Sequence, residues 1–475
     1  MFGFPNGPAR YEPAKPAPSL PPWVGTVLAL RPLAMTSLRA ALLGSAAALL
    51  GTVALADAPA PPRALSLEDA LAELEHQSPS LEQARQRREQ AAGLARQALA
   101  AALPTLTASG SYVRNSDAAT APIGRLLSAL QPGAPAPPDL VIQPREAFGA
   151  NGTLRVPLVA PSAWADVAAA RSAERAAGES AEAARLELRA ALVQAAWSAA
   201  AGDEVVAASE RAVGSADDQT RLAERALAAG TGVPLAVLQA RTEAVKRRSD
   251  LARARADRAR AELAAGVLLG RAEPVRIAVP AARPPAALDP RALAEEAEGH
   301  RPEVRALAAQ VEAAEHDRAS ARLRLLPQLS ASASAFAQTV PYPTGKEEGW
   351  RVTVDLTWPL YDGGLRYGKA RQAEGRLAEA SAALAAQRVA IAQEVDDAAR
   401  DVGLAVERLA LAEEQARLAG EAAATARRGF AGGVASSLDV LDANDRLFQS
   451  EVGLAQARAR LGLALAAVDR ATGRS

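Results

Sequence analysis

The chain has 475 residues, of which 49% are hydrophobic but only 3% are aromatic, and its 54 basic and 54 acidic residues cancel. A chain so poor in large apolar side chains suits closely packed helices with small residues at their contacts rather than a wide globular core, and its balanced charge argues against a nucleic-acid-binding surface. Because it has no cysteine and only three scattered histidines, disulfides, thiolate metal sites and a lipidated cysteine are excluded, and we expect no metal, no cofactor, no catalytic residue and no enzymatic activity.

The N-terminal region is expected to be a targeting segment. Residues 1–34 are rich in proline, and we place them upstream of the true start at Met35. Residues 35–56 have the pattern of a secretory signal peptide, with a basic residue, an apolar run, and the small residues Ala54 and Ala56 around the cleavage site. A membrane anchor is the alternative, but the run is shorter and richer in alanine than the roughly 20 strongly apolar residues of a spanning helix. An exported chain without a later apolar span is expected in the periplasm, the medium or the outer membrane.

The rest of the chain contains one structural plan twice. We place the first repeat at 57–271 and the second at 291–475, joined by a proline-rich linker at 272–290 that lies where the shorter helices end, halfway along the helical rod. Four landmarks recur in the same order, which an alanine-rich chain does not easily produce by chance. The matches are Pro79 with Pro302, Pro104 with Pro327, 156–158 with 358–360, and 229–238 with 432–441.

Each repeat contains a predicted β-hairpin, at about 104–158 and about 327–360, where the apolar residues change to a period of two. Strands of about ten residues cross a bilayer when they are tilted. Trp350 and Trp358 end the apolar row of the second hairpin, and we expect them, with Tyr112 of the first, at the membrane interface. A soluble, half-buried hairpin has the same period. Two isolated hairpins are only marginally stable, however, so other subunits must supply the strands that close their edges.

A predicted helical hairpin follows each β-hairpin, at about 162–269 and about 365–472. The long first helix of each would extend about 95–100 Å at 1.5 Å per residue. A helix of about half that length returns from the turn, and another of similar length enters the sheet, so the two are expected to stack end to end beside the long helix. The entering helices are predicted at about 67–102, interrupted at Pro79, and at about 302–325.

The second helical hairpin turns at 430–442, with the sequence F-A-G-G-V-A-S-S-L-D-V-L-D. Gly432 and Gly433 let a helix stop and reverse, and Ser436 or Ser437 is expected to cap the returning helix. Two carboxylates, Asp439 and Asp442, then lie three residues apart on one helix face. Taken alone, they favour an acidic first turn that interacts with the helix dipole.

This succession of an aromatic residue, glycine, serine and L-D-V-L-D resembles the periplasmic tip of the TolC-like outer-membrane efflux proteins. The duplicated strand–strand–helix order and the L-P and P-L strand boundaries extend the resemblance over about 64–473. The resemblance implies a mixed α/β membrane protein with a duplicated strand–strand–long helix plan. Three copies would form a homotrimer with a twelve-stranded transmembrane β-barrel in the outer membrane, continued by a periplasmic α-helical coiled-coil barrel. It implies a passive exit duct of a tripartite efflux or type I secretion system, with a periplasmic adaptor protein and an inner-membrane pump or exporter as partners.

By position, Asp439 and Asp442 match the family's gating carboxylates. This implies a ring of six acidic groups in the trimer, with cation selectivity or a raised pKa for some of them. Phe430 and Ala435 stand where family members have tyrosine and, in some, a latching arginine, so closure by those bonds is not expected. The glycine-rich turns are candidates for adaptor docking, although glycine there is equally expected for the turn alone. The residues predicted for this role are Gly230, Gly232, Phe430, Gly432, Gly433, Ser436 and Leu438.

The competing interpretation is a periplasmic or surface coiled-coil rod that acts as a scaffold or adhesin. It accounts for the helices but not for the alternating strands with tryptophan ends or the duplicated turns. The sequence does not indicate which substrate is exported, although the absence of histidine- or methionine-rich tracts disfavours a dedicated metal exporter.

Overall fold

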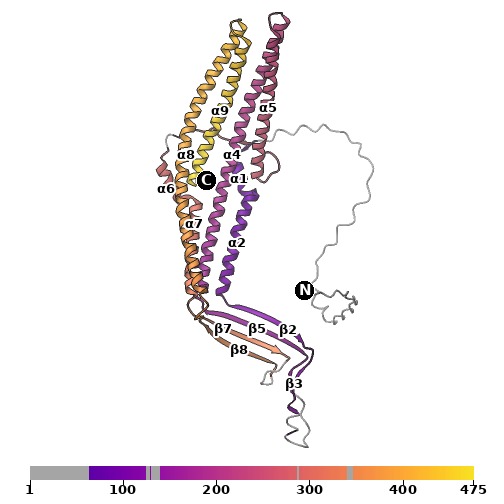
Figure 1. The fold of residues 1–475 in the computed structure, drawn as a ribbon, viewed down its shortest axis with the longest axis vertical. Coiled ribbons are helices and arrows are strands. Elements are labelled where there is room, and N and C mark those ends of the chain that lie inside the picture. Colours follow the sequence, from indigo (N-terminus) through magenta and orange to yellow (C-terminus); the bar gives the residue numbers. More distant parts are fainter. Residues whose placement is uncertain (1–63, 125–128, 130–139, 286–287, 340–345, 475) are drawn as a thin grey trace, which may run out of the picture. The chain divides into compact units, whose positions relative to one another are not determined.

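The computed structural model describes residues 64–124, 129, 140–285, 288–339 and 346–474, and these show the duplicated plan (Figure 1). The predicted signal peptide and the segment upstream of it lie outside the described residues, as does part of the loop of the second β-hairpin.

Four long strands form one antiparallel sheet in the order β2-β5-β7-β8. The first repeat supplies β2 (Thr105–Arg114) and β5 (Glu146–Val159), and the second supplies β7 (Gln328–Gln338) and β8 (Glu348–Thr357). The two repeats therefore meet at the centre of the sheet, where β5 pairs with β7, and β2 and β8 are its edges. A short ribbon of β3 (Ala119–Ala121) and β4 (Leu140–Gln143), not expected from the sequence, extends the first hairpin.

The register gives the sheet one apolar and one polar face. Leu154 pairs with Leu106 on one side and with Ala333 on the other, and Ala333 pairs with Val352, so all four strands place apolar residues on the same face. The residues one position along, such as Ser109, belong to the polar face. Many large apolar side chains of the first face are exposed: Leu106, Tyr112, Phe148, Leu154, Trp350, Val352, Val354 and Leu356.

In the first repeat, three helices pack along α4 (Pro161–Ala228), whose 68 residues span about 100 Å. These are α1 (Leu67–Gln77), α2 (Pro79–Ala102) and α5 (Pro234–Leu268). The end-to-end arrangement of α2 and α5 beside α4 agrees with the prediction. None of the helices in the described ranges is both long enough and apolar enough to cross a membrane.

The second repeat has the same arrangement around α8 (Leu365–Ala431), which packs against α7 (Pro302–Leu323) and α9 (Ser437–Thr472). A further helix, α6 (Pro290–His300), was not predicted; it precedes Pro302 as α1 precedes Pro79. The side chain of Asp289 caps α6 by accepting a hydrogen bond from the Arg291 N–H at 3.0 Å. Proline starts several helices, because its fixed φ suits the first turn and its missing N–H would be unpaired there: Pro79, Pro161, Pro234, Pro290 and Pro302.

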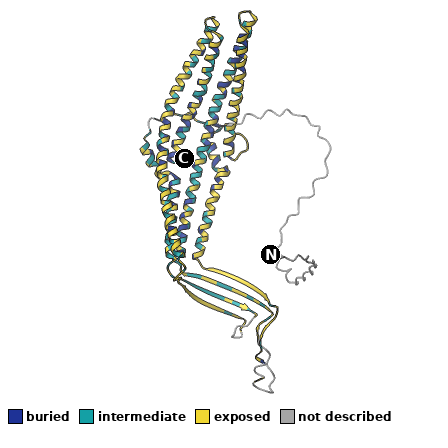
Figure 2. Cartoon of the chain, viewed as in Figure 1, coloured by how far each residue is buried: buried dark blue, intermediate teal, exposed yellow. Residues whose placement is uncertain are grey.

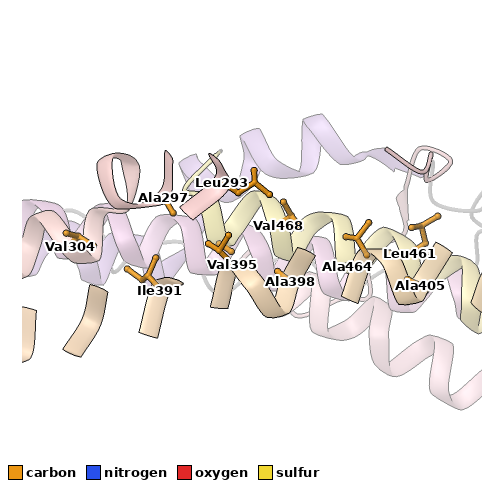
Figure 3. Packing of buried hydrophobic residues seen from close by; sticks show 12 residues of the cluster. Leu293, Ala297, Val304, Ile391, Val395, Ala398, Ala405, Leu461, Ala464 and Val468 are labelled. Carbon is orange, nitrogen blue, oxygen red and sulfur yellow. The ribbon is translucent and has the colours of Figure 1, made fainter. Parts of the chain in front are cut away.

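The buried residues are mostly alanine, valine and leucine along the contacts between helices (Figure 2). The largest cluster joins Val395 of α8, Leu461 of α9 and Leu293 of α6 (Figure 3). A second cluster joins Leu192 of α4 to Ile277, which lies in β6 (Ile277–Ala278) and pairs in parallel with β1 (Leu65–Ser66). The chain that links the two repeats therefore packs against the middle of α4.

Candidate functional site at the turns of the helical hairpins

The turn between α4 and α5 depends on two glycines. Gly230 has φ +73°, a left-handed conformation that residues with a side chain rarely adopt. The N–H groups of Thr231 and Gly232 both donate to the carbonyl of Ala226, at 3.0 and 2.9 Å. A Cβ on Gly232 would lie 2.7 Å from the Leu227 nitrogen, so this close approach also requires glycine.

The turn between α8 and α9 has the same hydrogen bonds. The N–H groups of Val434 and Ala435 donate to the carbonyl of Gly429, at 2.9 and 3.2 Å. Gly433 has φ +75°, whereas Gly432 has φ −87° and lies in a region open to other residues. Of the two glycines predicted to reverse the chain, only Gly433 needs its conformational freedom.

Gly429, which was not predicted from the sequence, also lies at a close contact in this turn. A Cβ there would lie 3.1 Å from the Cβ of Ala435. In the first turn the equivalent positions hold Ala226 and Gly232, and a Cβ on Gly232 would lie 3.1 Å from the Cβ of Ala226. Each turn thus has glycine at one of two facing positions and alanine at the other. The aligned stretches 229–238 and 432–441 contain Gly232 and Ala435 but not Ala226 and Gly429, so the exchange becomes apparent only from the contact.

Ser436 and Asp439 form a reciprocal cap at the start of α9. The Asp439 N–H donates to the Ser436 Oγ at 3.2 Å, and the Ser436 N–H donates to Asp439 Oδ2 at 2.7 Å. The Ser436 hydroxyl also donates to Asp439 Oδ2 at 2.7 Å. The two hydrogen bonds that Asp439 Oδ2 accepts from the Ser436 hydroxyl and N–H lower the pKa of Asp439. Of the two serines predicted as possible caps, Ser436 is the one that caps α9. Asp439 lies in the first turn of this helix, which was the alternative to a role in the gate.

Asp442 lies one turn further along α9 and is exposed to solvent. Its carboxylate pairs with Arg446 at 2.9 Å, with both side chains more than half exposed. Such surface pairs contribute little to stability. The raised pKa predicted for some gate carboxylates concerns several copies together and stays a prediction; in the single chain, Asp439 has the opposite shift.

The other predicted residues surround the turns. Leu438 is 62% exposed, and the unpredicted Val434 is 87% exposed. Phe430 is half-buried and lines a pocket with Leu222 of α4 and Val440 of α9. Apolar side chains exposed together in this way favour a contact with another protein.

A buried arginine, not predicted from the sequence, connects the two helical hairpins. Arg247 of α5 is only 4% exposed, and it forms an ion pair with Asp445 of α9. Its guanidinium also lies 4.5 Å from the centre of the Phe448 ring. Burial opposes ionisation of Asp445, but the hydrogen bonds and charges of Arg247 and Lys246 lower its pKa. In the sequence, Arg247 lies in a basic run typical of a solvated surface.

The three predicted interface aromatics lie on or beside the sheet. Trp350 is 79% exposed on β8, and the rings of Tyr112 and Phe148 lie 4.8 Å apart. Trp358 was expected on the strand but follows the end of β8, and its Nε1 donates to the carbonyl of Leu325 at 3.2 Å.

The family model described as "Outer membrane efflux protein" matches residues 70–271 and 293–474. Among solved structures, the outer membrane protein VceC of Vibrio cholerae is 23% identical, with a TM-score of 0.71 over 86% of this chain and 96% of that chain. A membrane protein from Pseudomonas aeruginosa is 23% identical, with a TM-score of 0.73 over 86% and 93%. The CmeC outer membrane channel of Campylobacter jejuni is 17% identical, with a TM-score of 0.74 over 86% and 85%. The comparison with curated proteins finds no match.

These likenesses confirm the predicted fold class. The chain has the duplicated α/β plan of channels in which a trimeric β-barrel is continued by an α-helical barrel.

Proposed function

Because the chain belongs to the outer membrane efflux protein family, we propose that it is the passive exit duct of a tripartite efflux or type I secretion system. The protein lies in the outer membrane and extends into the periplasm. It catalyses no reaction in this proposal. Small molecules or exported proteins pass through it, and the energy comes from an inner-membrane partner.

The observation that carries the proposal is the sheet with one exposed apolar face, whose edge strands among the described residues are β2 and β8. In a homotrimer, β8 of one copy would pair with β2 of the next, because a sheet edge inside a bilayer must be closed. The apolar face, with Trp350 79% exposed in the single chain, would then contact lipid, and the polar face would line the lumen. A periplasmic rod leaves this exposed apolar face without a role.

The turns of the helical hairpins form the periplasmic entrance in this proposal. Three copies bring together three Asp439 and three Asp442 side chains, and the cap that lowers the pKa of Asp439 keeps it charged at neutral pH. A ring of fixed negative charge at a constriction attracts cations and repels anions. We assign the gate to these two residues.

The partners are a periplasmic adaptor protein and an inner-membrane pump or exporter. The adaptor would dock at the glycine-containing turns, where Leu235, Leu438 and Val434 present exposed apolar side chains. Gly230 and Gly433 serve the docking surface by setting the direction in which the chain reverses.

Ion selectivity in a planar lipid bilayer tests the duct and the gate together. The purified protein is compared with an Asp439→Asn/Asp442→Asn variant and with Asp396→Asn/Asp397→Asn, a control that removes the same charge from partly exposed and exposed positions on α8. We expect cation-selective channels whose reversal potential in a salt gradient moves toward zero in the first variant only. Channels with unchanged selectivity would remove the gate and keep the duct, whereas no channels at all would overturn the proposed function.

A further inference from the structure

A cavity of about 480 Å³ lies between the two helical hairpins, close to their turns. Its walls come from α4 of the first hairpin and from α8 and α9 of the second, and α9 packs against both of the other helices (Figure 1). A second cavity of about 360 Å³ shares several lining residues with it, among them Arg427 and Asn444. Because small-molecule sites have volumes of about 300–1,000 Å³, the first cavity has the size of such a site.

The lining of this cavity has a surplus of positive charge. Arg221 pairs with Asp218 within α4, so these two charges cancel. Arg225 and Arg427 also line the cavity, and neither forms an ion pair within the described part of the chain. The Nε of Arg427 donates to the carbonyl of Ala423 at 3.2 Å, which leaves its charge uncompensated. Two such guanidinium groups favour an anion, because each can donate two parallel hydrogen bonds to a carboxylate.

Apolar side chains form another part of the lining. Val440 of α9 is 1% exposed, Phe430 of α8 is half-buried, and Leu222 of α4 is 46% exposed. Gln219 of α4, which is 4% exposed, also lines the cavity, and its Nε2 donates to the Ser437 hydroxyl of α9 at 3.1 Å. The aromatic ring of Phe430 favours a ligand with an aromatic ring of its own.

Asn444 of α9 adds a polar group to this lining. Its Oδ1 is buried and accepts no hydrogen bond from the residues that the structure describes. A buried acceptor without a donor is unfavourable, and such groups are rare in folded proteins. A hydroxyl group on a ligand in the cavity would supply the donor.

The first repeat has an ion pair at the equivalent positions. By the alignment of the two turns, Arg427 and Asn444 correspond to Glu224 and Arg241. Arg241 pairs with Glu224 at 2.7 Å and thereby joins α5 to α4. In the second repeat arginine replaces the glutamate and asparagine replaces the arginine, so this pair cannot form between α8 and α9. The two positions that satisfy each other in the first repeat are therefore available to a ligand in the second.

We propose that the cavity binds an aromatic carboxylate that carries a hydroxyl group, and that this ligand holds the two helical hairpins together. The carboxylate pairs with Arg225 and Arg427. The ring packs beside Phe430 and Val440, and the hydroxyl donates to Asn444 Oδ1. Because both hairpins contribute to the walls, the ligand binds best while they are packed against each other, so its binding stabilises that arrangement.

Isothermal titration calorimetry with p-coumarate, in neutral detergent, tests the site. This probe has a carboxylate and a hydroxyl at opposite ends of an aromatic acid. We expect saturable binding of one probe per chain, weakened about tenfold or more in Arg225→Gln/Arg427→Gln. The matched control, Arg171→Gln/Arg408→Gln, removes two exposed arginines from the same two helices outside the cavity and should bind like the natural chain. Equal affinities of the two double variants, or no saturable binding to the natural chain, would overturn the site.

The hydroxyl contact is tested with cinnamate, which lacks the hydroxyl group of p-coumarate. The natural chain should bind cinnamate about fivefold more weakly than p-coumarate, whereas Asn444→Leu should bind both probes equally. The same preference for p-coumarate in both proteins would show that the hydroxyl pairs elsewhere, and would overturn the role of Asn444.

A variant that carries the ion pair of the first repeat provides a second test. Arg427→Glu combined with Asn444→Arg should join α8 to α9 as Glu224 and Arg241 join α4 to α5. We expect this variant to unfold at the temperature of the natural chain and to lose p-coumarate binding. Retained binding would contradict the assignment of the carboxylate and hydroxyl contacts to these two residues.

Hydrogen exchange tests whether the ligand holds the hairpins together. Peptides that cover 240–255 and 440–455 contain the contact of Arg247 with Asp445. They should exchange more slowly in saturating p-coumarate, and the Arg225→Gln/Arg427→Gln variant should not respond. Unchanged exchange in the saturated natural chain would overturn the clamping and leave the binding site.

The effect on conduction rests on the proposed function, because it requires that the turns form the entrance of a channel. In a planar lipid bilayer, p-coumarate should lower the open fraction of the natural chain but not of Arg225→Gln/Arg427→Gln. An unchanged open fraction, with binding confirmed by calorimetry, would overturn the link between the site and the entrance. Protein that forms no channels would overturn the proposed function, while calorimetry would still decide the site.

Discussion

Replacing Arg247 by methionine should loosen the contact between the two helical hairpins. Methionine keeps most of the apolar stem but removes the guanidinium, which is 4% exposed and pairs with Asp445, with Glu243 at 2.6 Å and with Asp250 at 3.3 Å. Among the residues that the structure describes, Asp445 would keep Lys246, at 3.3 Å, as its cationic partner. Because Asp445 is on α9 and the arginine on α5, the loss of this one pair acts between the hairpins.

The size of the effect follows from burial. Removing one partner of a buried ion pair costs about 3–5 kcal/mol. We expect less here, about 2 kcal/mol, because the Asp445 side chain is 28% exposed and retains Lys246. At about 1.4 kcal/mol per factor of ten, local opening of the contact should become about 30-fold more frequent.

Hydrogen exchange measured by mass spectrometry on detergent-solubilised protein reports such local opening. Peptides that cover 240–255 and 440–455 should exchange faster in Arg247→Met, while those of the sheet should not change. The control is Arg248→Met, because Arg248 is the next residue, is 62% exposed and makes a single surface pair with Asp217. Equal exchange in the two variants would refute the reasoning. Adding Asp445→Asn to Arg247→Met should recover part of the protection, because the uncompensated charge is then gone.

Three further predictions concern the turns and the sheet. Gly429→Ala should crowd the Cβ of Ala435 at 3.1 Å and lower the exchange protection of the Val434 and Ala435 amides; adding Ala435→Gly should restore it, and no recovery would mean that the contact is not the cause. The pKa of Asp439 is lowered on folding, so the cap at the start of α9 should be fully effective above the unfolded-state pKa of about 3.9 and be lost as pH falls through the lower folded-state value. Protection factors of peptides that cover 436–442 should fall in acid, and an equal fall in Asp439→Asn would contradict this. Trp350, isolated by replacing the other tryptophans with phenylalanine, should be quenched by brominated lipid in vesicles; quenching by aqueous iodide instead would place it in the lumen.

Most of the fold could be predicted because the sequence contains signals at the ends of its helices and strands. Pro79 and Pro302 fix helix starts through their φ and missing N–H, and the change from helical period to period two marks the strands. Because the plan occurs twice, each boundary of a helix or strand is predicted a second time from different residues. The elements missed were short ones, such as α6 and the pairing of β1 with β6. Their position depends on packing against distant segments.

The candidate site was harder to predict, because its residues depend on contacts between distant segments. Arg247 is buried by a helix that begins at Ser437, so its local sequence indicates a solvated charge. Gly432 and Gly433 are the same residue type, so the sequence does not show which of them has a positive φ; the backbone conformation does. The position of Asp439 suits both a helix cap and the proposed gate, but the structure of a single chain shows only the cap.

The pairing of β5 with β7 at the centre of the sheet has a consequence for symmetry. The joint between the repeats within one chain has the same form as the joint proposed between chains, so the assembled channel would be built from six near-equivalent modules. The modules differ at the entrance: Ala236 and Gln239 of the first repeat occupy the positions of Asp439 and Asp442 in the second. Charged and uncharged turns would therefore alternate around the pore. Duplication with divergence thus reduces a pseudo-sixfold ring to threefold symmetry, and only every second module would act on ions.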